Sequence, residues 1–190
     1  MTCGNDKSRI AIVLRNQPIN NRPSKKVFIV GNLNIDLIIR NVAQLPVWGQ
    51  EVLGSDYHIF SSGQSAYTAF ALSKLNIGTK IISCVGDDVY GDMIIRDLSN
   101  STVDVSSVQK IKNGKTGITV AIVRKDGERA FVSDPSSLVS FNRSMAEKGL
   151  SELGSASLTC VLGSFFLPGF SLEDVKFCFE KSHESGCMTL

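Results

Sequence analysis

The sequence contains no apolar run long enough to cross a membrane. Its longest continuous runs, such as Val27 to Val30, are only a few residues long, whereas a spanning helix needs about 20 residues. The first nine residues also lack the layout of a signal peptide, which is a positive head, an apolar stretch and a cleavage site of small residues. These absences predict a protein with no membrane partner and a cytoplasmic location.

Cysteine pairs of the C-x-x-C type are also absent, although the chain of 190 residues has five cysteines. An odd number without paired spacing argues against a disulfide framework or a zinc site and favours free thiols in a reducing compartment. Cys84 and Cys160 lie inside apolar runs, so we expect both to be buried and without a chemical role.

Neither sign of charge dominates the chain. Its 20 Lys and Arg residues and 18 Asp and Glu residues give a net charge of +2, and no basic stripe suggests a nucleic-acid partner. His58 and His183 are far apart in the sequence, which argues against a histidine-centred metal site or catalytic triad. Three aspartates fall within residues 86–92, and a turn followed by a helix N-terminus explains them better than a metal site does.

What the chain does contain is an alternation of apolar strands and amphipathic helices. We expect residues 1–25 to form a flexible leader, with a short strand at Ile10 to Leu14, and residues 26–190 to form one α/β unit. This order predicts a doubly wound, mostly parallel sheet. The segments 36–60 and 116–133 have no helix between their strands, and Asp126-Gly127 is a strong hairpin signal. These two segments therefore predict a small antiparallel sheet that stands off the main one.

Four helices and several buried strands follow from the spacing of apolar residues. The helices are expected over 66–76, 91–99, 141–153 and 171–185, and the buried strands over 27–31, 80–85 and 158–162. A short edge strand is expected near 105–108, and a further strand starts at 188–190. We expect Ser65 to cap the first helix and Gly78 to follow its end.

Two polar side chains, Asn34 and Asp36, follow the first buried strand. Alternate residues of an extended segment point the same way, so these two side chains can converge on one ligand. A carboxylate and an amide together suit adjacent hydroxyl groups, because the first accepts hydrogen bonds and the second both donates and accepts them. The alternative is that both residues only form a turn at the end of the strand.

The loop from Ser61 to Ser65 is made of small and polar residues and precedes the first predicted helix. Free backbone N–H groups at a helix start can hold an anion or a hydroxyl, and Gly63 lets the backbone approach a ligand closely. The loop matches neither the G-x-G-x-x-G pattern nor the phosphate-binding P-loop. An ordinary capped helix start explains this loop better than a binding site does. The missing G-x-G-x-x-G argues against a nucleotide-binding oxidoreductase.

Taken together, these segments resemble the ribokinase-like (pfkB) carbohydrate kinase family, from about Lys26 to Leu190. Val30-Gly-Asn-Leu-Asn-Ile-Asp36 resembles its first strand with an N-x-D motif, and Leu45-Pro-Val-Trp-Gly-Gln-Glu51 its L-P-x-x-G-E segment. Residues 62–69 lie where the family carries G-G-x-x-x-N-x-A. Residues 84–91 match V-G-x-D-x-x-G, and residues 126–131 match the D-G-E-R-x-F lid hairpin.

The resemblance implies a doubly wound α/β body with a β lid, which together transfer phosphate from ATP, with Mg²⁺, to a hydroxymethyl group of a sugar or nucleoside. It also implies a homodimer formed through the lid. The implied substrate-binding residues are those of the N-x-D motif and the signature loop, with one weaker candidate after the 158–162 strand. They are Asn34, Asp36, Ser62, Gly63, Gln64, Tyr67 and Ser164.

This sequence also departs from the family pattern. Ser62 replaces the first glycine of the signature and Tyr67 replaces its asparagine. A tyrosine offers one hydroxyl and a ring, which predicts an altered pocket. The G-A-G-D segment, which supplies the family's anion hole and catalytic Asp, does not occur in the 190 residues. We therefore expect only the N-terminal part of a kinase fold, with no catalytic residue and no motif for ATP or Mg²⁺. The alternative is an inactive fragment that only binds a ligand or partner.

Overall fold

The computed structural model describes residues 26–190 of the chain. The strand expected at Ile10 to Leu14, and the leader that contains it, lie outside the described residues.

The main sheet has five strands in the order β5-β4-β1-β8-β9, and every neighbouring pair is parallel. Its bounds are β1 Lys26–Gly31, β4 Gly78–Gly86, β5 Asp104–Ile111, β8 Ala156–Leu162 and β9 Met188–Thr189. The predicted α/β class with a mostly parallel sheet is confirmed. The expected edge strand is β5, and it is longer than the sequence pattern suggested.

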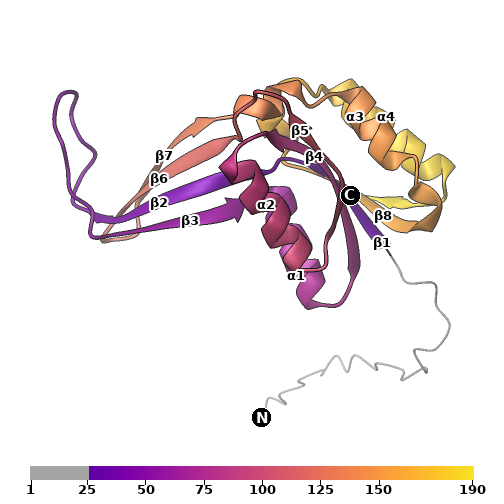
Figure 1. Ribbon diagram of the computed structural model, residues 1–190, viewed down its shortest axis with the longest axis horizontal. Coiled ribbons are helices and arrows are strands. Elements are labelled where there is room, and N and C mark those ends of the chain that lie inside the picture. The colour runs from indigo at the N-terminus through magenta and orange to yellow at the C-terminus, as the bar shows by residue number, and fades with distance from the viewer. Residues whose placement is uncertain (1–25) are drawn as a thin grey trace, which may run out of the picture.

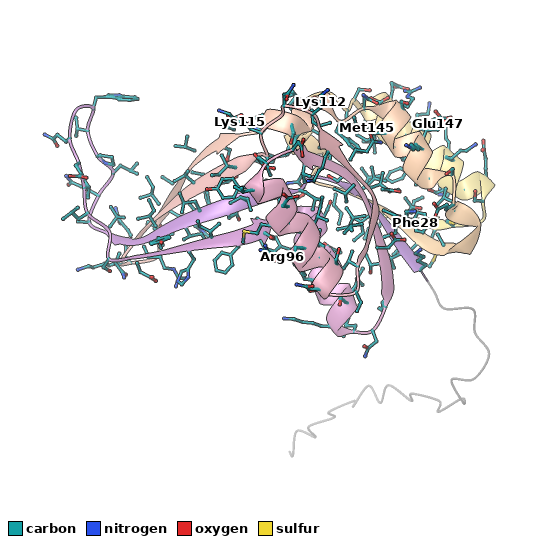
Figure 2. The ribbon with its side chains drawn as sticks, in the orientation of Figure 1. Phe28, Arg96, Lys112, Lys115, Met145 and Glu147 are labelled. Atoms are coloured by element: carbon teal, nitrogen blue, oxygen red, sulfur yellow. The ribbon has the colours of Figure 1, made fainter. Side chains whose placement is uncertain are left out.

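Helices cover both faces of this sheet (Figure 1). Helices α1 (Gln64–Lys74) and α2 (Val89–Asn100) lie on one face, and α3 (Arg143–Leu150) and α4 (Leu172–Glu184) lie on the other. Strand β1 shows why both faces need cover, because Val27 and Ile29 pack with α1 and α2 while Phe28 and Val30 pack with α3 and α4. Phe28 lies inside the body, whereas Glu147 is exposed on α3 (Figure 2). Because apolar side chains of β1 point alternately to both faces, the sheet is packed between two layers of helices.

A second sheet, here called the lid sheet, extends to one side of the body (Figure 1). Its order is β3-β2-β6-β7, with β2 Asn34–Val42, β3 Asp56–Ser62, β6 Ile118–Arg124 and β7 Arg129–Asp134. The prediction of an antiparallel sheet was wrong for its central pair, because β2 and β6 are parallel. Strands β2 and β6 follow the carboxyl ends of the parallel strands β1 and β5, so they leave the body in the same direction.

The start of α1 differs from the prediction. Gly63 is the N-cap residue, and Ser65 lies inside the helix, fully buried, with no hydrogen-bond partner for its hydroxyl. The end of the helix also differs, because Asn76 rather than Gly78 adopts the left-handed conformation, at φ 56°. Gly78 is instead the first residue of β4. Asparagine tolerates this conformation better than most residues do, so it can replace glycine after a helix.

The other helix starts follow the expected cap chemistry. The Asn142 side chain caps α3, Asp88 caps α2, and Ser171 forms a capping box with Asp174 at α4. Helix α3 is shorter than the predicted 141–153. The chain continues from it into the 3-10 turn η2 (Leu153–Ser155) before β8, and two further 3-10 turns are η1 (Ser136–Ser140) and η3 (Ser164–Phe166).

Among residues 26–190, no helix combines the length and the apolar character that crossing a membrane requires.

Candidate functional site

The body and the lid sheet meet at a pocket beside the carboxyl end of β1. The pocket has a volume of about 350 Å³, which lies at the lower end of the range for small-molecule sites. Ligands of α/β folds bind at this edge of the sheet. The lining residues come from the β1–β2 connection, the start of α1, the lid sheet and η3. They are Asn32, Asn34, Asp36, Ser62, Gly63, Gln64, Tyr67, Thr119, Phe131, Ser133 and Phe166.

A chain of hydrogen bonds runs through the floor of this pocket. The backbone N–H of Gln64 donates to Asn32 Oδ1 at 3.2 Å, and Asn32 Nδ2 donates to Asn34 Oδ1 at 3.0 Å. Asn34 Nδ2 then donates to Asp36 Oδ1 at 2.9 Å. Both asparagines are buried, so these bonds offset the cost of removing the amides from water. This series of hydrogen bonds therefore holds Asp36 in a fixed position at the pocket.

Tyr67 completes this chain from the other side. Its hydroxyl donates to Asp36 Oδ2 at 2.8 Å and accepts from Ser62 Oγ at 2.8 Å. Burial raises the pKa of the Tyr67 phenol, and Asp36 also raises it, whereas the Ser62 hydrogen bond opposes the increase. The phenol is therefore a neutral donor at physiological pH. We call the connected residues Asn32, Asn34, Asp36, Ser62, Gln64 and Tyr67 the polar chain.

Two glycines make room for Asn32. A Cβ on Gly63, whose φ is 102°, would lie 2.4 Å from the Asn32 carbonyl oxygen. A Cβ on Gly163, whose φ is 66°, would lie 1.9 Å from Asn32 Oδ1. Any larger residue at either position would be strained and would push Asn32 away. The glycines therefore allow three separate loops to meet around one amide.

The lid sheet contributes residues that the sequence analysis missed. Asp36 pairs with Thr119, and Thr119 pairs with Ser133, so all three side chains lie on one face of the lid sheet. Phe131 follows on the same face at the next alternate position of β7, and its side chain is about half exposed. The alternation within each strand was visible in the sequence, but the register that joins the three strands was not.

Six of the seven predicted site residues line the pocket: Asn34, Asp36, Ser62, Gly63, Gln64 and Tyr67. Ser164 does not line it; Phe166, two positions later in η3, does. Residues two apart in a 3-10 helix point in different directions, which explains why Phe166 faces the pocket and Ser164 does not. That these residues bind a sugar remains a prediction.

The part of the chain from 26 to 190 brings together no three His, Cys, Asp or Glu side chains that could hold a metal ion. The Asp88 carboxylate already has partners at the start of α2 and just before β6. It accepts hydrogen bonds from the backbone N–H groups of Gly91 and Thr116, each at 2.8 Å, and from the Thr116 hydroxyl at 2.6 Å. No described residue is therefore assigned to Mg²⁺ or to ATP.

Comparison with known proteins gives a family match over nearly all of the described chain. A family model described as pfkB family carbohydrate kinase matches residues 24–189. A ribokinase from Schizosaccharomyces pombe is 32% identical over 108 residues, which cover 54% of this chain and 34% of that protein. An ATP-dependent ribose-1-phosphate kinase from Halopiger xanaduensis is 31% identical over 109 residues, covering 57% of this chain and 36% of that protein.

Solved structures show the same fold. Arabidopsis thaliana ribokinase complexed with ribose and ATP superposes with a TM-score of 0.72 at 17% identity, over 87% of this chain and 52% of that one. The ribokinase of Cryptococcus neoformans in complex with ADP gives a TM-score of 0.68 at 17% identity, over 87% and 48%. The chain thus spans about a third of the length of these curated relatives and about half of the solved structures.

Proposed function

The chain belongs to the pfkB family of carbohydrate kinases, and we propose that it binds a sugar or nucleoside in the pocket between body and lid. The proposed reaction is the ATP-dependent phosphorylation of a hydroxymethyl group on this ligand, with Mg²⁺, in the cytoplasm. The ATP and ADP in the related solved structures support ATP as the phosphate donor.

One observation carries the proposal. The polar chain fixes Asp36 in the wall of a cavity of about 350 Å³, between the carboxyl end of β1 and the lid sheet. Each carboxylate oxygen can accept more than one hydrogen bond, so Asp36 can still accept from ligand hydroxyls. A hydrogen bond to a charged group is stronger than one between neutral groups, which makes Asp36 the principal contact.

In the proposed reaction, the role of the described residues is to position the acceptor sugar. Phosphoryl transfer depends on holding the acceptor in line with the phosphate donor and on stabilising the charge that is transferred. The polar chain would orient the acceptor, and Thr119, Phe131 and Ser133 of the lid sheet would cover it and exclude water.

The test uses the protein expressed from its complete reading frame, together with a panel of pentoses, hexoses and nucleosides. Binding is followed by ligand-observed NMR, and ATP turnover is followed by ADP release. We expect at least one panel member to bind and to be phosphorylated. Asp36→Asn should lower its affinity about 10- to 100-fold, which corresponds to one or two charge-assisted hydrogen bonds.

Asp126→Asn is the matched control, because Asp126 is exposed at the tip of the same sheet and pairs with Arg124. This variant should bind like the wild type. A panel in which nothing binds would refute the proposal. Binding without ADP release would refute the kinase activity and leave a protein that only binds ligands, which is the second function to consider.

A homodimer through the lid sheet is a further part of the proposal. The face of the lid sheet opposite the pocket carries Leu37 beside Ile59 and Val120, and Val120 beside Val132. Ile59 and Val132 are exposed at 37% and 68%, and a second copy would cover them. Light scattering should give twice the chain mass for the wild type and the chain mass for Ile59→Lys. Leu172→Lys, an exposed position on α4, is the control, and a monomeric wild type would reject the dimer.

A further inference from the structure

The pocket contains a feature that a general sugar site does not require. The Tyr67 hydroxyl lies 2.8 Å from Asp36 Oδ2, and Asn34 Nδ2 lies 2.9 Å from Asp36 Oδ1. Both oxygens of the principal carboxylate are therefore already hydrogen bonded within the protein.

The two partners of Asp36 differ in how they affect a ligand. Asn34 is 6% exposed and donates one hydrogen bond to Oδ1, and a carboxylate oxygen can accept a second one from a ligand. Tyr67 is 52% exposed, and it is itself one of the residues that line the pocket. The phenol therefore occupies space beside Oδ2 that a ligand hydroxyl would need.

The position of the phenol is fixed from both sides. Ser62 is 1% exposed, and its hydroxyl donates to the Tyr67 hydroxyl at 2.8 Å. With one hydrogen bond accepted and its only proton donated to Asp36, Tyr67 has no second proton to offer a ligand. A ligand hydroxyl that displaced Tyr67 from Oδ2 would leave both Tyr67 and Ser62 to find new partners, which costs free energy.

We infer that Tyr67 sets the specificity of the pocket, so that it accepts a pentose with one free hydroxyl facing Asp36 in preference to one with two adjacent hydroxyls. The ligand class is a monodeoxy pentose. Asp36 Oδ1 takes the single hydroxyl, and the carbon that lacks a hydroxyl lies against the Tyr67 ring. This inference rests on the proposed sugar-binding function and names the substrate class within it.

The test compares D-ribose, 2-deoxy-D-ribose and 3-deoxy-D-ribose as ligands, with dissociation constants measured by NMR titration. For the wild type, at least one deoxy sugar should bind more tightly than ribose. Tyr67→Phe removes only the hydroxyl and frees Asp36 Oδ2. We expect this variant to prefer ribose over both deoxy sugars by about 5- to 10-fold, the equivalent of one additional hydrogen bond.

Two further variants separate specificity from stability. Tyr67→Asn should also prefer ribose, because an amide can donate to and accept from a second hydroxyl. Tyr90→Phe, on α2 outside the pocket, should keep the wild-type ratio of affinities. A merely structural role for Tyr67 would weaken all three sugars equally and leave the ratio unchanged.

A wild-type protein that binds ribose at least as tightly as both deoxy sugars would overturn the inference. If the wider panel contains a ligand but none of these three sugars binds the wild type or either Tyr67 variant, the inference fails and sugar binding stands. If nothing in the wider panel binds, the proposed function fails with it.

Discussion

The amino end of the main sheet and the carboxyl end of its strand β1 stabilise buried polar groups in opposite ways. At the amino end, Lys80 is 1% exposed, and its Nζ lies 2.7 Å from Glu152 Oε2 and 4.0 Å from Asp104 Oδ2. Lys26 Nζ also approaches Asp104 Oδ2, at 3.1 Å. At the carboxyl end, buried neutral amides lead to a single carboxylate, Asp36, which borders a cavity.

The difference shows why only one end is a candidate site. At the amino end each charge faces an opposite charge, and both lysines also lie within 6 Å of the Phe28 ring, at 5.5 and 5.8 Å. Those interactions stabilise the fold. At the carboxyl end of β1, the Asp36 carboxylate accepts hydrogen bonds from the neutral side chains of Asn34 and Tyr67, so a ligand that donates hydrogen bonds can still stabilise it.

The largest expected effect at the carboxyl end comes from Gly163→Ala. The new Cβ would lie 1.9 Å from Asn32 Oδ1 at a residue with φ 66°, so Asn32 must move and the polar chain must break. We expect a loss of about 3 kcal/mol in the free energy of unfolding, from strain and displaced packing, and a decrease in sugar affinity of at least about 10-fold.

Urea denaturation and NMR titration measure these two effects. Gly154→Ala is the matched control, because a Cβ there would meet nothing within 4 Å and its φ is not positive. Normal sugar affinity in Gly163→Ala would show that the pocket does not depend on Asn32.

At the amino end, Lys80→Ala should lower stability without changing the pocket. The substitution removes a buried ammonium group and its methylene groups beside Phe28, for a cost of about 2 kcal/mol in the free energy of unfolding. Lys80→Met keeps most of the packing and should cost less, about 1 kcal/mol. Both are measured by urea denaturation, and sugar affinity should stay at the wild-type value. A loss of affinity in either variant would contradict the separation of the two ends.

The smallest expected effect is a pH dependence at the amino end. Burial alone would raise the pKa of Asp104, but hydrogen bonds from Ser106 and Lys26 and the charge of Lys80 outweigh it and lower the pKa to about 2, from an ordinary value of 3.8. A lowered pKa stabilises the fold above the ordinary pKa, and this contribution is lost as the pH falls from about 4 to about 2.

We expect a loss of about 1 kcal/mol over this window, because the carboxylate is partly solvated. The free energy of unfolding, measured by urea at several pH values, should fall more steeply for the wild type than for Asp104→Asn. Parallel curves for the two proteins would contradict the assignment to Asp104.

The local pattern of the chain predicted most of its elements. Apolar runs gave the buried strands β1, β4 and β8, and helical spacing gave α1 to α4, because both signals depend on neighbours within a few residues. The errors arose where distant residues decide. Ser65 was expected to cap α1, but Gly63 is the residue that fits against the Asn32 carbonyl oxygen. The β2–β6 pair was expected to be antiparallel, but the direction of the body strands makes it parallel.

The candidate site shows the same division. Asn34, Asp36 and the loop at 62–67 were found from the sequence because alternation and a motif place them close together along the chain. Thr119, Phe131, Ser133 and Phe166 were not, because they come to the pocket from three separate elements, β6, β7 and η3. The bonds from Tyr67 to Asp36 and from Ser62 to Tyr67 likewise depend on the packing of α1 against β2 and β3.

The sequence by itself determined the class of the fold, the family and half of the pocket, because hydrophobic periodicity and short motifs are local properties. Only the tertiary structure decided that the buried Lys80 at the amino end of the sheet meets carboxylates, and that Asp36 at the carboxyl end of β1 meets neutral side chains. It also decided that the Tyr67 hydroxyl rests on Asp36. Those outcomes depend on strand register and on glycines that let three loops meet around Asn32, and contacts between residues far apart in the chain leave no periodic signal in the sequence.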